Sequence, residues 1–236
     1  MTSTTRGCGT CGCWPARSSS VPSEALLESG SEFARGLLDV LELICPAPSL
    51  LIDDVSSGQG IIRPLDAAVG EPGRMWTTTS GVDLRFFYRY DLDPDGSYLR
   101  VLSSSIGLSL TPTSRCLLRI EYDRGKGPDR PDAHVHIDAD GALWGTVLTR
   151  SDQPLRPLHT LHIPAGGRRF RPTMEDFVEF LLAEKFVRPA RDDWRQVLRA
   201  KRQEWEETQA KAAARRHASA VAETLRGLGW KVAPPP

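Results

Sequence analysis

Histidine and arginine are concentrated in one stretch of the chain, residues 131–172. Four of the five histidines lie there, namely His134, His136, His159 and His162. Three arginines follow the histidines closely, at Arg168, Arg169 and Arg171. Imidazole titrates near neutral pH and ligates transition metals, while guanidinium binds phosphate in a bidentate manner. The stretch therefore predicts either acid–base chemistry on an anionic substrate or a metal centre.

The segment AHVHIDA, residues 133–139, alternates in the manner of a β-strand. Side chains two residues apart on a strand share a face, so His134 and His136 are expected to point the same way. Val135 and Ile137 point to the opposite side, which is the natural core side. The two imidazoles are thus presented together rather than required for the core.

In a second histidine segment, LHTLHI at residues 158–163, the same alternation places the two histidines on opposite faces of the strand. His162 shares a face with Thr160, whereas His159 lies on the other face and is the weaker candidate. If this strand lies beside residues 133–139, His162 approaches His136. The functional prediction depends on that adjacency.

Two kinds of chemistry fit these residues. Neutral imidazoles and a carboxylate can hold zinc, iron or manganese. Without a metal, His136 and His162 would act as an acid–base pair with His134 beside them. Phosphate would then be bound by four arginines: Arg119, Arg168, Arg169 and Arg171. Residue types alone do not decide between a metal, another cofactor and neither.

Several further segments alternate with a period of two and are joined by polar turns. They predict strands at residues 82–90, 98–102, 116–122 and 142–148, in addition to the two histidine segments. Residues 49–79 are rich in Gly and Pro, and we expect short strands or turns there. Short polar connections imply antiparallel pairing of consecutive strands.

Helical patterns flank these strands on both sides. An apolar stripe predicts a helix from Ser23 to about Ile44, with an interruption near Gly30. Thr173 and Asp176 form a capping box at the start of a second helix, which Pro189 ends. A long charged helix follows, capped by Asp192 or Asp193. The predicted fold is α+β, with an antiparallel β-sheet of about five or six strands, one N-terminal helix and two C-terminal helices.

The chain divides into three parts by composition. Residues 1–22 read as a disordered leader, 23–188 as the α+β domain, and 189–236 as a long charged C-terminal helix and tail. The leader contains Cys8, Cys11 and Cys13, which offer three thiolates, whereas a structural zinc site uses four. An odd total of five cysteines does not indicate a disulfide framework.

Overall charge and hydropathy exclude some classes of protein. The 30 Lys and Arg residues balance 30 Asp and Glu residues, so the chain lacks the global basic character of a general nucleic-acid binder. No stretch reaches the roughly 20 apolar residues that a membrane span requires. The N-terminus lacks the apolar core of a secretory signal. We therefore expect a cytoplasmic protein without membrane contact.

Two resemblances to known families add expectations. From Leu117 to Phe186 the order is a strand ending in RIEYD, a Pro-rich turn, the HVHI strand, a late histidine strand and a Thr-capped helix. This order resembles the toxin-like proteins of bacterial toxin–antitoxin pairs of the TumE class. The resemblance implies a small α+β domain that acts on RNA or nucleotides and is countered by an antitoxin-like protein partner.

The second resemblance is shorter. The HxH strand followed by Asp140 is similar to the first cupin motif, in which two histidines, a carboxylate and a later histidine bind a metal. Asp140 stands where cupins usually have Glu, and a second cupin motif is absent. A third alternative is a non-enzymatic partner-binding module, in which the charged helix after Pro189 makes the contact and the histidines are structural.

Overall fold

The computed structural model describes residues 24–56, 58–66, 70–110, 115–125, 131–138, 163–165 and 171–233. Its helices are α1 (Glu24–Leu41), α3 (Met174–Ala183), α4 (Trp194–Arg216) and α5 (Ala218–Gly227). Its strands are β1 (Leu50–Ser56), β2 (Gln59–Asp66), β3 (Glu71–Pro72), β4 (Met75–Trp76), β5 (Val82–Leu92), β6 (Leu99–Leu110), β7 (Arg115–Asp123), β8 (Ala133–Ile137) and β9 (Ile163–Pro164). None of these helices is both long and apolar enough to cross a bilayer.

Within these ranges the strands form one antiparallel sheet in the order β1-β2-β5-β6-β7-β8-β9, with β3 on β2 and β4 on β5. Six of the strands have five residues or more; β3, β4 and β9 have two each. The prediction of an α+β fold with an antiparallel sheet, an N-terminal helix and C-terminal helices is confirmed. Residues 49–79, expected as short strands or turns, contain the longer hairpin of β1 and β2.

The central hairpin of β5 and β6 forms where the alternation is strongest. Its turn is closed by the Asp93 carboxylate, which accepts the backbone N–H groups of Ser97 and Tyr98 at 2.6 and 3.0 Å. Gly96 adopts φ 67° in this turn, a conformation that favours glycine. Local turn chemistry therefore sets the hairpin that the sequence predicted.

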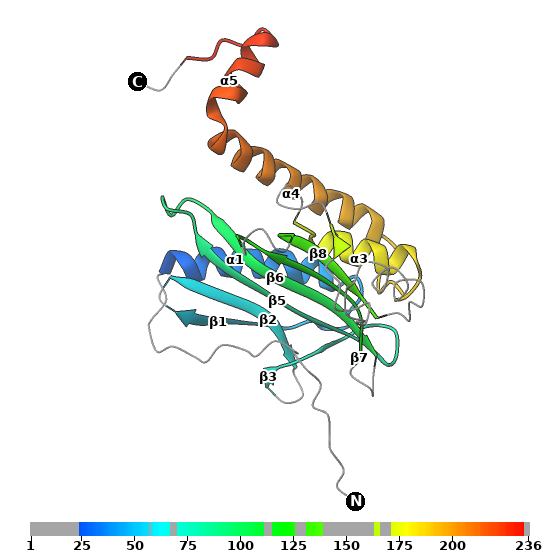
Figure 1. Cartoon of the computed structure of the whole chain (residues 1–236). Helices are drawn as coiled ribbons and strands as arrows, with labels where there is room; N and C mark the ends of the chain where they lie inside the picture. The colour runs from blue at the N-terminus through cyan, green and yellow to red at the C-terminus, as the bar shows by residue number, and fades with distance from the viewer. Residues whose placement is uncertain are drawn as a thin grey trace, which may run out of the picture.

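The helix α1 packs on β1, β2, β5 and β6, and α3 and α4 pack against α1 and each other on the same side of the sheet (Figure 1). Four alternating side chains of β5 are buried on this face: Leu84, Phe86, Tyr88 and Tyr90. The rings of Phe33 in α1 and Tyr88 meet edge to face, with centroids 5.2 Å apart. Burial of this apolar face leaves the opposite face of the sheet for polar residues.

The helix α1 continues through Gly30, where the sequence predicted an interruption. Gly30 is buried and lies against the Tyr90 phenol, which occupies the space that a side chain at position 30 would need. The glycine is present for close packing on the sheet, and this does not require the helix to break.

The C-terminal helices differ in part from the prediction. Thr173 caps α3, and the capping box with Asp176 is present. Asp193 precedes α4 but makes no side-chain capping bond; its carboxylate pairs with Arg191 at 2.6 Å instead. The predicted single long helix is divided at His217, where φ is −126°. In Figure 1, α4 runs from the sheet and α5 lies beyond its far end.

Candidate functional site

The face of the sheet opposite the helices carries the candidate site. In the register of β7 and β8, Glu121 lies opposite His134, and Arg119 lies opposite His136. Directly paired residues share a face, so all four side chains project to the same side. Ile120 and Val135, which alternate with them, pair on the helix-covered side. The predicted common face of His134 and His136 is confirmed.

Glu121, His134 and His136 form a compact cluster. Their candidate ligand atoms all lie within 4.8 Å of one another. The Nε2 atoms of His134 and His136 lie 3.1 and 3.2 Å from the same Glu121 Oε2. The two imidazoles meet edge to face with centroids 4.9 Å apart. Two rings thus direct one nitrogen each toward a single carboxylate oxygen.

The backbone orients the His134 ring. Its Nδ1 lies 3.1 Å from the carbonyl oxygen of Pro131. A carbonyl only accepts, so Nδ1 carries the proton and donates this bond. This bond turns Nε2 toward Glu121. Metal-binding histidines are commonly oriented in this way, by a backbone carbonyl that accepts from the other ring nitrogen.

Glu121 is held in its ionised form. Burial opposes the charge, but hydrogen bonds from His134 and His136 and the positive charge of Arg119 outweigh it, and the pKa of Glu121 lies well below its usual range. The Arg119 Nε lies 2.7 Å from Glu121 Oε1, so the two carboxylate oxygens face different partners.

Within the cluster the histidine side chains are shielded from solvent, whereas Glu121 and the neighbouring Arg119 are partly exposed. His134 and His136 are buried, with 5% and 6% exposure, although the sequence did not require them in the interior. The side chains of Glu121 and Arg119 remain 30% and 32% exposed. A ligand would reach the cluster from the β7 side.

The sheet also settles part of the predicted adjacency. Ile163 in β9 lies opposite Val135 in β8, so the end of the LHTLHI segment borders the HVHI strand. His162, His159, Arg168 and Arg169 fall outside the described residues, as do Asp140, the leader with its cysteines and the expected strand at 142–148.

Arg171, grouped with the histidines from the sequence, lies on the other face of the sheet. Its guanidinium is 5.8 Å from the centroid of the buried Tyr88 ring, on the helix-covered side. The sequence places it near the histidines along the chain, but the entry into α3 brings it to the opposite side of the sheet. We therefore remove Arg171 from the phosphate-binding set.

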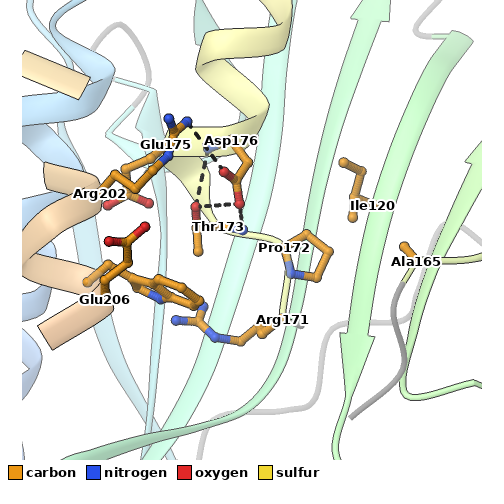
Figure 2. A pocket seen from close by; sticks show the side chains of 10 residues that line it. Ile120, Ala165, Arg171, Pro172, Thr173, Glu175, Asp176, Arg202 and Glu206 are labelled. Atoms are coloured by element: carbon orange, nitrogen blue, oxygen red, sulfur yellow. Dashed lines mark hydrogen bonds and ion pairs between the residues drawn. The ribbon is translucent and has the colours of Figure 1, made fainter. Parts of the chain in front are cut away.

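A cavity of about 390 Å³ lies around Arg171, between the start of α3, α4 and the sheet (Figure 2). Charges of both signs line it, and Arg202 pairs with Glu179 and, at 3.7 Å, with Asp176. Asp176 is also engaged in the α3 cap. Arg202 and Asp176 are thus engaged with other groups, and the cavity lies on the helix-covered side, opposite the histidine face.

The carboxylate of the cluster, Glu121, was not among the candidate site residues from sequence. Strand parity put Glu121 on the same face as Arg119, which was a usable signal. The connection of 124–132 left the register between the strands undetermined, and the register decides which residue faces His134.

No family model matches this chain, and neither the curated proteins nor the solved structures contain a match to it. The functional assignment consequently depends on the site itself.

Proposed function

We propose that Glu121, His134 and His136 bind a divalent transition-metal ion and that the protein is a metal-dependent hydrolytic enzyme. The observation that supports this proposal is the convergence of two imidazole Nε2 atoms on one carboxylate oxygen. Zinc ligands at 2.0–2.1 Å lie roughly 3.3 Å from one another in a tetrahedral site. The two nitrogen–oxygen distances, 3.1 and 3.2 Å, fit that spacing.

The orientation of His134 supports a cation in the cluster. Because Nδ1 faces the Pro131 carbonyl oxygen, Nε2 is the ring nitrogen turned toward Glu121, 3.1 Å from Oε2. The Nε2 of His136 reaches the same oxygen at 3.2 Å. A metal ion satisfies both nitrogens and the carboxylate without charging either ring.

The chemistry follows from the number of protein ligands. Two histidines and one carboxylate leave coordination positions for water and substrate, as in catalytic zinc sites and in facial-triad iron sites. A bound ion would polarise the substrate and lower the pKa of its water, which makes hydroxide available near neutral pH. Arg119, beside Glu121, would orient this carboxylate and add positive charge at the open side.

Metal binding is tested directly. The protein is purified without chelators for elemental analysis, then stripped and titrated with Zn²⁺, Mn²⁺ and Co²⁺ by calorimetry. We expect one ion per chain, and Co²⁺ absorption bands that report four- to six-fold coordination. Affinity should fall as pH is lowered from about 7.5 to about 5.5, because protons compete for the imidazoles.

Matched variants localise the ion. Glu121→Gln, His134→Gln and His136→Gln should each weaken metal binding by at least about tenfold. His217→Ala, which removes an exposed histidine between α4 and α5, should leave it unchanged. Circular dichroism establishes that each variant folds. If wild-type protein binds no more metal than the three cluster variants, the proposal is wrong, and any activity that survives chelation would indicate metal-free acid–base catalysis by the histidines.

A second candidate is a partner-binding module, favoured by the C-terminal region. No residue of α5 is buried, and Leu228 and Trp230 just beyond it are 71% and 66% exposed. The product of a neighbouring reading frame, coexpressed with this chain, should copurify with full-length protein and with His134→Gln. Loss of copurification on truncation after Arg216 would support this function, whereas retention would contradict it.

A further inference from the structure

A row of residues crosses four strands on the open face of the sheet. Arg85 in β5 lies opposite Gly107 in β6, Gly107 lies opposite Arg119 in β7, and Arg119 lies opposite His136 in β8. Paired residues share a face, so both arginines project on the side of the metal-ligand cluster. The row leads from the cluster toward β5.

Gly107 leaves the sheet surface between the two arginines without a side chain. It is buried, and a Cβ at this position would lie 3.3 Å from Cys116 Sγ and 3.7 Å from Arg119 Cγ. The stem of Arg119 therefore packs over β6 where any other residue would place a side chain. Glycine inside a strand marks sites where another group approaches the backbone closely.

The guanidinium groups on this face retain unused hydrogen-bonding capacity. The Nε atoms of Arg85, Arg89 and Arg119 are buried and have no hydrogen-bond partner among the described residues. Arg119 Nε is close to Glu121 Oε1 at 2.7 Å, but the contact lacks hydrogen-bond geometry. Arg85 Nε lies 3.6 Å from Asp83 Oδ1, which is an ion pair without a hydrogen bond. Buried donors without acceptors are costly unless a ligand satisfies them.

Two other arginines of the same sheet have their acceptors in place. Arg63 pairs with Asp53, and Arg100 donates from Nε and Nη2 to the two carboxylate oxygens of Asp91 at 2.8 and 2.6 Å. The Arg100 side chain is 30% exposed, close to the 36% of Arg85 and the 32% of Arg119. Exposure is thus similar. The difference is that the Nε atoms of Arg85 and Arg119 have a carboxylate nearby but make no hydrogen bond within the described ranges.

We infer that Arg85 and Arg119 bind a phosphoryl group of the substrate beside the metal ion, which makes the substrate a phosphate ester. This inference rests on the proposed metal site and assigns its substrate class. The two arginines stand on strands about 9.6 Å apart, so a group that joins them must present several acceptors in different directions. The tetrahedral oxygens of phosphate point in more directions than the two coplanar oxygens of a carboxylate, so phosphate is better suited to contact two guanidinium groups and a metal at once.

Metal binding would strengthen this anion site. An ion on Glu121 neutralises part of the charge that now faces Arg119, and the guanidinium then has more positive charge to offer an anion. An ion held by Glu121, His134 and His136 would supply an activated water for attack on phosphorus; the P–O bond to the leaving group would break, and the leaving oxygen would take a proton from water. The phosphoryl group is held throughout by Arg85 and Arg119.

The experiment measures binding of inorganic phosphate to the Zn²⁺-loaded and the stripped full-length protein by calorimetry. Arg85→Gln and Arg119→Gln should each weaken phosphate binding by about tenfold or more. Arg100→Gln, with similar exposure and a filled partner, should leave phosphate binding unchanged. Arg85→Gln should also leave Zn²⁺ affinity unchanged, because the ion-pair partner of Arg85 within the described ranges is Asp83 and not a residue of the cluster. Malonate should bind at least about tenfold more weakly than phosphate.

The outcomes separate this inference from the metal proposal. Zn²⁺ binding with phosphate affinity that does not depend on Arg85 or Arg119 overturns the inference and leaves the metal site standing. Malonate binding as tight as phosphate overturns the assignment of a phosphate ester. If Zn²⁺ does not bind but phosphate binds in an arginine-dependent manner, the metal proposal fails and the anion site is supported. Hydrolysis of bis(p-nitrophenyl) phosphate lost in Arg85→Gln, with folding and Zn²⁺ affinity intact, supports both.

Discussion

At the scale of single residues, the site depends on one carboxylate that three side chains approach. His134 and His136 face Glu121 Oε2, while Arg119 lies against Oε1. Each contact favours the ionised carboxylate, and together they exceed the cost of its partial burial. The protein therefore carries a fixed negative charge beside two imidazole nitrogens, which is the combination that a divalent cation requires.

This charge predicts an acid-dependent loss of stability in stripped protein. The folded pKa of Glu121 is lowered from an ordinary value of 4.5, so its contribution is complete above that pH and is lost as the pH falls further. Glu121→Gln should lower the free energy of unfolding near neutral pH by about 1–3 kcal/mol. Below pH 4.5 the difference from wild type should shrink, which urea titrations at several pH values would measure.

A surface carboxylate provides the control. Glu204 pairs with Lys201 at 3.1 Å but is 65% exposed. Glu204→Gln should change the free energy of unfolding by less than about 1 kcal/mol at every pH. An equal effect of the two substitutions would contradict a special role for Glu121 in stability.

At the scale of elements, the packing of α1 on the sheet explains why Gly30 is present, which the helical pattern of the sequence did not explain. Gly30 lies against the Tyr90 phenol, and Gly60 in β2 contacts the same ring from the sheet. Both glycines make room for one large buried side chain. The helix is therefore continuous where its sequence alone favoured a break.

Two glycines of α1 give a matched prediction. Gly30→Ala should destabilise the protein by about 1–3 kcal/mol, because its methyl group would overlap the Tyr90 ring. Gly36→Ala meets no atom within 4 Å and should stabilise by about 0.5–1 kcal/mol through helix propensity. Chemical denaturation of the two variants measures both effects. Shifts of the same sign would show that Tyr90 does not fill the space beside Gly30.

At the scale of the whole molecule, the sheet separates an apolar side from a polar side. The helices bury the first, and the second carries the histidine–glutamate cluster and the arginine row. Beyond them, α4 contributes Trp194 and Leu198 to the core, whereas α5 contributes no buried residue. The expected relation to TumE-class toxins or to cupins stays a prediction, since no comparison bears on it.

The unequal burial of the last two helices predicts the effect of truncation. Removal of residues 217–236 should shift the thermal midpoint by less than about 2 °C, because α5 packs little surface on the sheet. Removal from Trp194 onward should destabilise by several kcal/mol, as loss of large buried side chains does. Calorimetric scans compare the two. A large shift for the shorter truncation would show that α5 stabilises the domain.

The sequence by itself determined the class of fold and, within each strand, which residues share a face. Period-two alternation in β5, the Asp93 turn and the Thr173 capping box are local, so each could be identified from a few neighbouring residues. The same parity placed His134 and His136 on one face. Local chemistry also led to two errors, the break at Gly30 and the cap at Asp193, where packing and an ion pair decided otherwise.

Only the tertiary structure decided which residues from different strands meet. The register of β7 and β8 brought Glu121 to the histidines, and the register of β5 and β6 placed Arg85 in line with Arg119. The path of the chain into α3 carried Arg171 to the other face. Register and crossover depend on contacts between residues far apart in the sequence, and a shift of one residue would reverse every face.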